Sequence, residues 1–170
     1  MGQNTKESEM EERDLAGGAV VIKLHEGESV ENMTVQDMMD RRLVLVIDPS
    51  KSDPIMKLPC GRFDRNKWDD TVRETASREV GEETGLVRVH ISNCPNHHIV
   101  DEMRNHDRHF FLGGTSEDLD QGFRGDENGN RMHVITRFTV RQVLERQVEI
   151  LPPHLQVLER LIEQADSVSV

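Results

Sequence analysis

Residues 70–84 constrain this chain more than any other segment, because their pattern predicts a helix with one apolar face. Val72, Ala76 and Val80 recur every four residues, the spacing that places side chains on one side of a helix. Gly85 follows directly, and glycine is common just beyond a helix C-terminus. The segment therefore predicts a helix that packs this face against the core.

The last turn of this helix is acidic on the same side. At about 100° per residue, Glu79 and Glu83 project within about 20° of Val72, and Glu82 lies to one side. A helix C-terminus already carries about half a negative charge, so clustered carboxylates there destabilise the fold unless something offsets them. Three converging carboxylates are typical ligands of a hard divalent cation, Mg²⁺ or Mn²⁺. The alternative is a solvated acidic helix end, which the spacing alone does not exclude.

The other segments alternate between strand-like and helical patterns and predict one mixed α/β domain. Residues 1–14 hold five acidic and two basic side chains and predict a disordered acidic tail, so the domain covers 15–170. Residues 25–41 are interpreted as a polar insertion with at most a short helical turn, and 113–131 as a long Gly-, Asp- and Asn-rich loop. The expected strands are 16–24, 42–48, 86–92, 98–103, 108–112 and 132–138, with a short extended segment at 56–59 and further helices at 139–147 and from Pro153 onward.

Composition excludes several classes of protein. Acidic residues outnumber basic ones by 32 to 21, giving a formal net charge of −11, which disfavours binding of duplex nucleic acid. No apolar run approaches the roughly 20 residues of a membrane span, so no membrane contact is expected. Two cysteines, Cys60 and Cys94, are too few for a disulfide framework or a structural zinc site.

Residues 78–86, Arg-Glu-Val-Gly-Glu-Glu-Thr-Gly-Leu, resemble the second half of the Nudix box, with every specified position filled. The resemblance implies the Nudix α/β/α sandwich, a mixed sheet flanked by helices, and a Nudix hydrolase that cleaves phosphoanhydrides. Such an enzyme uses Mg²⁺ or Mn²⁺ to neutralise charge on the phosphates and to activate water. The site residues that the resemblance implies are the metal ligands Glu79, Glu82 and Glu83, Arg78 to orient a carboxylate, and the backbone carbonyl of Gly61 as a further ligand.

The first half of the box departs from the family pattern. Counting back from Arg78 puts Asp70 where the family has Glu, and Asp64 where it has Gly. Residues 58–62, Leu-Pro-Cys-Gly-Arg, resemble the usual entry to the box, so the loop that follows is expected to be three residues longer than standard. Asp70 is expected to cap the helix N-terminus. The general base stays open between Glu79 and three acids of the 113–131 loop: Glu117, Asp126 and Glu127.

Basic residues lie on the segments that border the box, which indicates a small, highly anionic ligand. Residues 105–112 and 137–144 resemble segments of diphosphoinositol polyphosphate phosphohydrolases, in which Arg, Lys and His bind inositol phosphates, and the chain is also similar to small fungal Nudix effector proteins. The leading hypothesis is therefore a Mg²⁺-dependent hydrolase of inositol pyrophosphates, located in the cytoplasm or secreted into a host cytoplasm. The expected substrate-binding residues are Lys23, Arg42, Lys57, Arg62, Arg108 and His109.

Two alternatives stay open. A nucleotide anhydride hydrolase, acting on dinucleoside polyphosphates or the mRNA 5′ cap, would stack a purine on an aromatic side chain such as Trp68. A Nudix fold retained as a non-catalytic module that binds a phosphate ligand belongs to another class. The longer loop and Asp70 favour that module, whereas the filled metal-ligand positions speak against it. No feature of the sequence predicts the oligomeric state.

Overall fold

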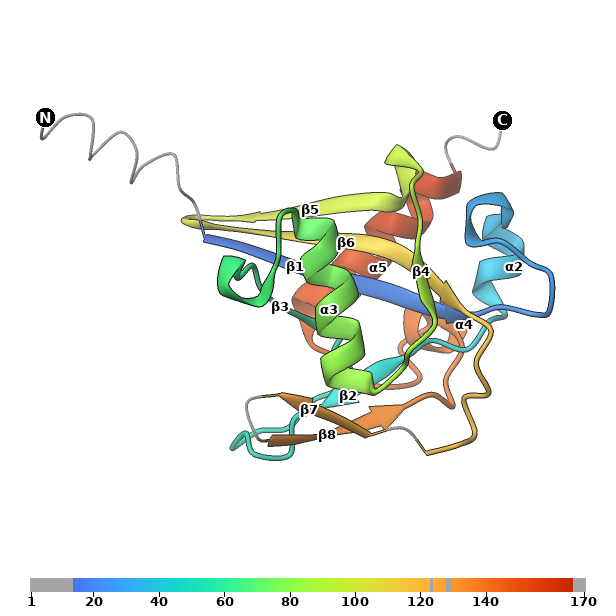
Figure 1. Ribbon diagram of the computed structural model, residues 1–170. Coiled ribbons are helices and arrows are strands. Elements are labelled where there is room, and N and C mark those ends of the chain that lie inside the picture. The colour runs from blue at the N-terminus through green and yellow to red at the C-terminus, as the bar shows by residue number, and fades with distance from the viewer. Residues whose placement is uncertain (1–13, 123, 128–129, 167–170) are drawn as a thin grey trace, which may run out of the picture.

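The computed structural model describes residues 14–122, 124–127 and 130–166 of the 170-residue chain (Figure 1). The tail expected at 1–14 therefore lies outside the described residues, except for Asp14, which already belongs to the first strand. The expected mixed α/β architecture, with a mixed sheet flanked by helices, is confirmed. No helix in the described part is long and apolar enough to cross a lipid bilayer.

The main sheet is built around two long parallel strands, β1 (Asp14–Lys23) and β6 (His106–Thr115). β3 (Cys60–Arg62) pairs with the free side of β1 and forms one edge of the sheet. β4 (Val89–Ile91) and β5 (His98–Met103) share the other side of β6, each antiparallel to it. The sequence pattern predicted β6 only over 108–112 and predicted no strand at 60–62.

A second, antiparallel sheet has the order β2 (Leu45–Ile47), β8 (Asn130–Ile135) and β7 (Arg124–Glu127). The prediction of a loop over 113–131 is wrong, because β6 ends at Thr115 and β7 lies inside the predicted loop. The sequence of β7, Arg-Gly-Asp-Glu, has no apolar alternation, so it is a strand only through backbone pairing with β8.

Two long helices cover opposite faces of the main sheet (Figure 1). α3 (Val72–Thr84) packs Ala76 and Val80 on one face and also lies beside β7 and β8. α5 (Pro152–Asp166) packs on the other face, against the side chains of β1 and β6 that alternate with those facing α3. The residues of α5 in this core are Val157, Leu158 and Leu161, and their partners on the strands include Val20, Ile22, Phe110 and Leu112.

The insertion at 25–41 is more ordered than its polar sequence predicts. It holds the 3₁₀ helix η1 (Val30–Asn32) and the helix α2 (Val35–Met39). Val30 and Met38 are buried in the core on the α5 side, so these scattered apolar residues anchor the insertion. Near the C-terminus, the predicted helix at 139–147 is confirmed in its middle as α4 (Val140–Leu144), which has a full capping box.

The ends of α3 are set by local chemistry. Thr71 is the N-cap, and its hydroxyl accepts a hydrogen bond from the Glu74 amide. The prediction that Asp70 caps this helix is therefore wrong by one residue. At the other end Gly85 adopts φ +78°, a left-handed conformation that glycine tolerates without a steric penalty.

Candidate active site

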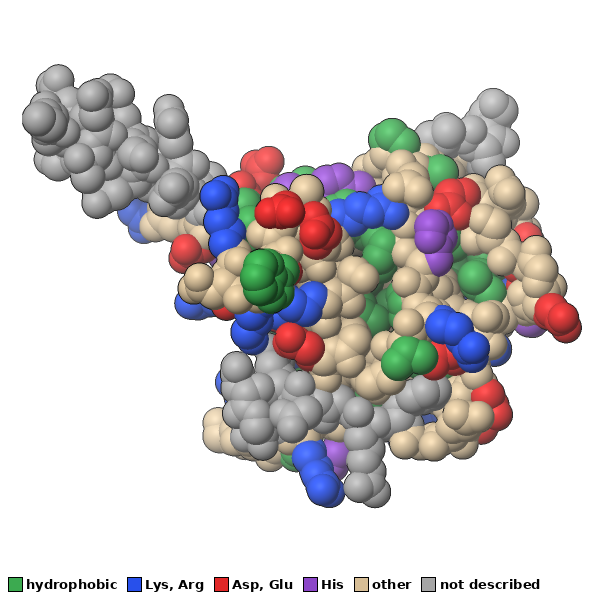
Figure 2. Space-filling view, in the orientation of Figure 1, with side chains coloured by type: hydrophobic (Ala, Val, Ile, Leu, Met, Phe, Trp, Pro, Cys, Tyr) green, Lys and Arg blue, Asp and Glu red, His purple; other side chains and the backbone are tan. Residues whose placement is uncertain are grey.

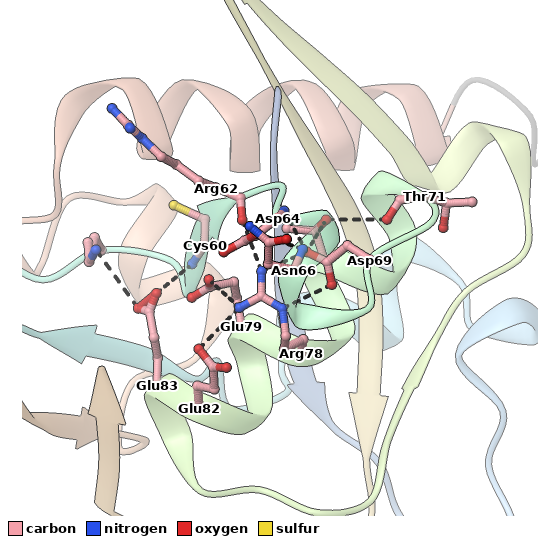
Figure 3. Close-up of polar contacts among 12 residues, drawn as sticks. Cys60, Arg62, Asp64, Asn66, Asp69, Thr71, Arg78, Glu79, Glu82 and Glu83 are labelled. Atoms are coloured by element: carbon pink, nitrogen blue, oxygen red, sulfur yellow. Dashed lines mark hydrogen bonds and ion pairs between the residues drawn. The ribbon is translucent and has the colours of Figure 1, made fainter. Parts of the chain in front are cut away.

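The acidic last turns of α3 lie against the edge strand β3 (Figure 3). Glu79 and Glu83 are buried, with exposed fractions of 3% and 0%, whereas the side chain of Glu82 is 32% exposed. Glu79 and Glu83 are one turn apart and share the face of α3 that also carries Ala76 and Val80 toward the sheet. A solvated helix end would leave such carboxylates in water, so their burial requires compensating partners.

Arg78 is the first of these partners and connects two of the predicted metal ligands. Its Nη1 atom donates to Glu79 Oε1 at 2.9 Å and to Glu82 Oε2 at 3.2 Å. Its Nη2 atom donates to the carbonyl oxygen of Arg62 at 2.9 Å, which ties α3 to β3. Hydrogen bonding to Asp69 raises the pKa of Arg78, so the guanidinium stays charged. Arg78 thus contacts two carboxylates of α3, and orienting them stays its predicted role.

Asp69, which the sequence pattern did not single out, holds the other side of this guanidinium. Arg78 Nε donates to Asp69 Oδ1 at 2.9 Å and Arg78 Nη2 to Asp69 Oδ2 at 2.7 Å, a bidentate pair. Burial opposes ionisation of Asp69, but hydrogen bonds from Arg78, the Asp64 amide and Thr75 hold the pKa of this carboxyl below its usual range. Asp70, which the spacing of the box put at the family's Glu position, is exposed. Asp69 thus supports the arginine of the box.

Neutralising Asp69 is expected to lower the hydrolysis rate while neutralising its neighbour is not. Asp69→Asn removes the charge that orients Arg78, and supporting residues of this kind typically change metal affinity or activity by about 10- to 100-fold. Asp70→Asn changes an exposed side chain and should stay within about twofold of wild type. Steady-state rates of the two variants on one substrate test this. Equal losses in both variants would contradict the assignment.

The loop between β3 and α3 explains the shift from Asp70 to Asp69. It contains the 3₁₀ helix η2 (Arg65–Lys67), capped by Asp64, whose side chain accepts from the Asn66 amide. Trp68 ends η2 in the left-handed region at φ +71° and is 88% exposed. The longer loop expected from the sequence is therefore folded into a defined turn that directs Asp69 inward.

β3 and the segment before it hold Glu83 and approach Glu79. The Cys60 amide donates to Glu83 Oε1 at 3.1 Å, and Lys57 Nζ lies 3.8 Å from Glu83 Oε2. A Cβ on Gly61 would lie only 2.1 Å from Cδ of Glu79, so the backbone of Gly61 and this carboxylate are in direct contact. The structure thus brings Lys57 and Gly61 to the acidic end of α3, and their roles in substrate and metal binding stay predictions.

The donor set fits a hard divalent cation in its chemistry. Carboxylate oxygens and a backbone carbonyl are the ligands that Mg²⁺ and Mn²⁺ prefer, and the space at Gly61 exists only because that residue has no side chain. Among the described residues, no three His, Cys, Asp or Glu side chains converge as a closed metal-binding group. Arg78 Nη1 occupies the space between Glu79 and Glu82 in this conformation. Glu79, Glu82, Glu83 and Gly61 therefore remain the predicted ligands.

Two of the predicted substrate-binding bases line a cavity of about 370 Å³ next to β3. Arg62 on β3 and Arg108 on β6 are both paired with Ala16 of β1 in the sheet, so they flank Ala16 on the same face. Arg108 also forms an ion pair with Asp101 of β5. The cavity is lined by Asp14, Ala16, Cys60, Gly61, Arg62, Asn105, His106 and Arg108.

Three other predicted substrate-binding residues lie elsewhere. Lys23 is at the far end of β1, where its Nζ donates to the carbonyl oxygens of Ser116 at 2.7 Å and Glu117 at 2.6 Å. Arg42 pairs with Asp120 at 2.8 Å. His109 alternates with Arg108 along β6 and so faces the opposite side of the sheet, and its ring stacks with that of His98. None of these three residues lines the cavity that Arg62 and Arg108 share.

The candidate general bases are also separated. Glu117 is buried, and its Oε2 accepts from the amides of Val87 at 3.0 Å and Arg88 at 2.8 Å, which gives it a role in holding the chain after α3. The side chains of Asp126 and Glu127 lie outside the described residues. Glu79 is the candidate whose carboxylate contacts β3.

His154 is a second residue that the sequence analysis missed. It lies in the first turn of α5, is 1% exposed, and its Nδ1 accepts from the Leu58 amide at 2.9 Å. Its position four residues before Leu158 and seven before Leu161 puts a histidine on the apolar face of α5, which is the signal that identifies it. Burial, together with the positive charges of Arg108 and Lys57, lowers the pKa of His154 to about 3.

Stability is expected to fall as the pH drops below 6.5, and His154 should account for part of that loss. Unfolded histidine binds a proton below about pH 6.5, whereas folded His154 stays neutral down to about pH 3, so the unfolded state gains protons between these values. The free energy of unfolding should therefore decrease by up to about 1.4 kcal/mol per pH unit from this group. Urea unfolding at pH 7, 6 and 5 should show a shallower slope in His154→Asn. Identical slopes would contradict the assignment.

Comparison with known proteins agrees with this fold. The sequence matches the family model described as the NUDIX domain over residues 29–160. No curated protein sequence matches the chain. The NUDIX domain of Shewanella oneidensis NrtR, solved in complex with ADP ribose, is 18% identical, with 89% of this chain and 88% of that chain covered and a TM-score of 0.59. An Ap4A hydrolase from C. elegans is 12% identical, with 91% and 96% covered and a TM-score of 0.55.

MutT, studied from Aliivibrio salmonicida and Vibrio cholerae, is 12% identical, with 90% of this chain and 99% of that chain covered and a TM-score of 0.53. At these identities the solved structures establish a shared fold, which confirms the expected sandwich. The family model covers more than three quarters of the chain and includes all of α3. The chain therefore belongs to the Nudix family and is a phosphoanhydride hydrolase.

Proposed function

We propose that this Nudix enzyme hydrolyses a phosphoanhydride bond in a nucleoside diphosphate or polyphosphate derivative, with Mg²⁺ or Mn²⁺ as cofactor. The observation that carries the proposal is the position of β3 between the acidic end of α3 and the cavity. Gly61 contacts Glu79, and the next residue, Arg62, lines the cavity together with Arg108. Because Gly61 and Arg62 alternate along β3, the cavity lies on the other side of this edge strand from Glu79, and a ligand bound there reaches the carboxylates of α3 around the edge of the sheet.

Each residue of the site has a defined task in this reaction. Arg62 and Arg108 offer guanidinium groups to phosphate oxygens, and Lys57 adds a positive charge beside Glu83. When bound, Mg²⁺ supplies charge neutralisation and Lewis acidity at the phosphates. Water adds to one phosphorus while the bond from that same phosphorus to the bridging oxygen breaks. The bridging oxygen leaves with the other phosphate, and the proton of water moves to a base. We assign this base to Glu79.

The lining of the cavity favours a nucleotide over an inositol pyrophosphate. An inositol pyrophosphate carries phosphates around its whole ring and so needs basic side chains on all sides. This cavity has Asp14 in its wall and the small Ala16 between its two arginines, and Arg108 is already paired with Asp101. On the face shown in Figure 2, basic and acidic side chains are interspersed around η2 and the start of α3. The lining of the cavity, with an acidic and a small side chain beside its two arginines, suits a ligand with a short chain of phosphates and an uncharged ring.

The names of two solved relatives are consistent with such a ligand. One structure contains ADP ribose and another is of an Ap4A hydrolase, and both ligands join adenosine to another group through phosphates. Inositol pyrophosphates stay the second candidate, because Lys57, Arg62 and Arg108 all border the site. A small phosphorylated substrate, rather than duplex nucleic acid, is also what the net charge of −11 favours.

A substrate comparison tests the proposal. ADP-ribose, diadenosine tetraphosphate, capped RNA and 5-diphosphoinositol pentakisphosphate are each assayed with Mg²⁺, and kcat/KM should be at least about 10-fold higher for one of the nucleotides than for the inositol compound. Arg108→Gln should raise KM for that substrate by about 10-fold, because it removes a charged phosphate contact. Lys23→Gln, at the far end of β1, is the matched control and should leave both kcat and KM at their wild-type values. Preference for the inositol compound would overturn the ranking.

A further inference from the structure

We propose that His154 is a positioning residue for the active site, which acts through residues 58–60 to place Glu83. His154 is not among the residues that line the cavity. It contacts the short segment of chain that joins the second sheet to β3, and the other end of that segment binds Glu83. The inference rests on the proposed function only in its premise that Glu83 binds the metal.

The segment has one hydrogen bond at each of three successive residues. The Leu58 amide donates to His154 Nδ1 at 2.9 Å, the carbonyl oxygen of Pro59 accepts from the Ala19 amide at 3.1 Å, and the Cys60 amide donates to Glu83 Oε1 at 3.1 Å. Just before it, Lys57 exchanges both backbone hydrogen bonds with Val46 of β2. The chain therefore changes partners at Leu58, from β2 to β1, and the Leu58 amide bonds to His154 instead of to either strand.

His154 supplies the acceptor for this amide from α5. An unpaired buried amide would be costly at Leu58, which is 0% exposed, so the direction in which the chain enters β3 depends on this bond. The ring is well fixed, because His154 is 1% exposed and packs edge-on against Phe110 with ring centroids 5.2 Å apart. A change in the entry direction of β3 moves the Cys60 amide, and Glu83 follows that amide.

The other nitrogen of the same ring lies beside the side chain of Cys60. Because Nδ1 accepts a hydrogen bond, a neutral His154 carries its proton on Nε2, and this atom lies 4.0 Å from Cys60 Sγ. Burial raises the pKa of the Cys60 thiol to about 12, so it remains uncharged. His154 therefore contacts both Leu58 and Cys60, the two ends of the segment. A leucine at this position would have no polar atom for either contact.

The experiment compares His154→Leu with His154→Asn, which keeps an acceptor at the place of Nδ1. Mn²⁺ affinity is measured by electron paramagnetic resonance, and exchange of the Leu58 and Cys60 amides by mass spectrometry or NMR. His154→Leu should weaken Mn²⁺ binding by about 10-fold or more and speed exchange at both amides, and His154→Asn should restore most of both. The matched control is His97→Leu, which removes another buried histidine, one hydrogen-bonded to Ser92 and remote from this segment.

The outcomes separate the inference from its alternatives. A folded His154→Leu with wild-type Mn²⁺ affinity would overturn it, as would equal losses in His154→Leu and His97→Leu, since these indicate general destabilisation. If His154→Leu does not fold, His154→Gln serves instead: its polar group reaches the place of Nε2, so weaker Mn²⁺ binding than in His154→Asn supports the inference and equal binding refutes it. None of these measurements uses substrate, so a wild type that binds Mn²⁺ but hydrolyses no nucleotide would contradict the proposed function alone.

Discussion

Glu79→Gln is expected to lower kcat by about 10³-fold or more while the enzyme stays folded, the largest loss we predict for any single side chain. The carboxylate of Glu79 is buried, accepts a hydrogen bond from Arg78 at 2.9 Å and contacts the backbone of Gly61. Glutamine has the same shape but no negative charge, so it neither binds a divalent cation well nor accepts a proton from water. Single-turnover assays with Mg²⁺ measure the loss of the chemical step directly.

A control on the same helix separates this effect from any change in α3 itself. Glu74 is exposed in the first turn of α3, and Glu74→Gln should keep kcat within about twofold of wild type. Melting curves without metal should show that Glu79→Gln is at least as stable as wild type, because removing a buried charge lowers the cost of desolvation. If Glu79→Gln keeps more than a tenth of wild-type kcat, the assignment of Glu79 as a catalytic residue is wrong.

The acidic face of α3 was predictable from the sequence because it depends only on helical spacing. Residues four positions apart lie on one face of any helix, so Val80 and Ala76 on the sheet imply Glu79 and Glu83 beside them. Gly85 marked the end of the helix for an equally local reason, its positive φ. Local geometry of this kind does not depend on the rest of the fold.

Asp69 was not predictable, since its role depends on a turn of the preceding loop. Spacing within the family put Asp70 at the Glu position of the box and predicted a helix cap there, whereas in the structure η2 and the left-handed Trp68 precede Asp69, which pairs with Arg78. Nothing in the residue types of 63–68 requires a non-glycine residue at positive φ, which is an uncommon conformation. The tertiary structure of the loop therefore decides that Asp69, and not Asp70, pairs with Arg78.

Which of the basic residues line the cavity also depends on pairing between strands that are distant in the sequence. Arg62 and Arg108 flank Ala16 only because β3 and β6 pair with β1 in this register, over 46 residues of separation along the chain. Lys23 is on the same strand as Ala16 yet lies seven residues away, which is about 23 Å along a strand. The sequence indicated that bases border the site but not which of them share a face.

Gly61→Ala is the second change with a large expected effect, although it adds only a methyl group. The new Cβ would lie 2.1 Å from Cδ and 2.3 Å from Oε1 of Glu79, far inside van der Waals contact, so the carboxylate or β3 has to move. Displacement of a catalytic group by about 1 Å can cost about 100-fold in rate, and we expect at least this loss in kcat/KM together with weaker Mn²⁺ binding. Strain in the buried site should also lower the free energy of unfolding by about 1–3 kcal/mol.

Gly81→Ala is the matched control, because the two glycines differ in what surrounds them. Gly81 lies within α3, and the nearest atom to a Cβ there is the carbonyl oxygen of Leu86 at 3.8 Å, an ordinary contact. Alanine in a helix interior is about 0.5–1 kcal/mol more favourable than glycine, so this variant should be more stable than wild type with unchanged kcat. Full activity in Gly61→Ala would show that the close contact between Gly61 and Glu79 is not needed for catalysis. It would also contradict the predicted role of the Gly61 carbonyl as a metal ligand.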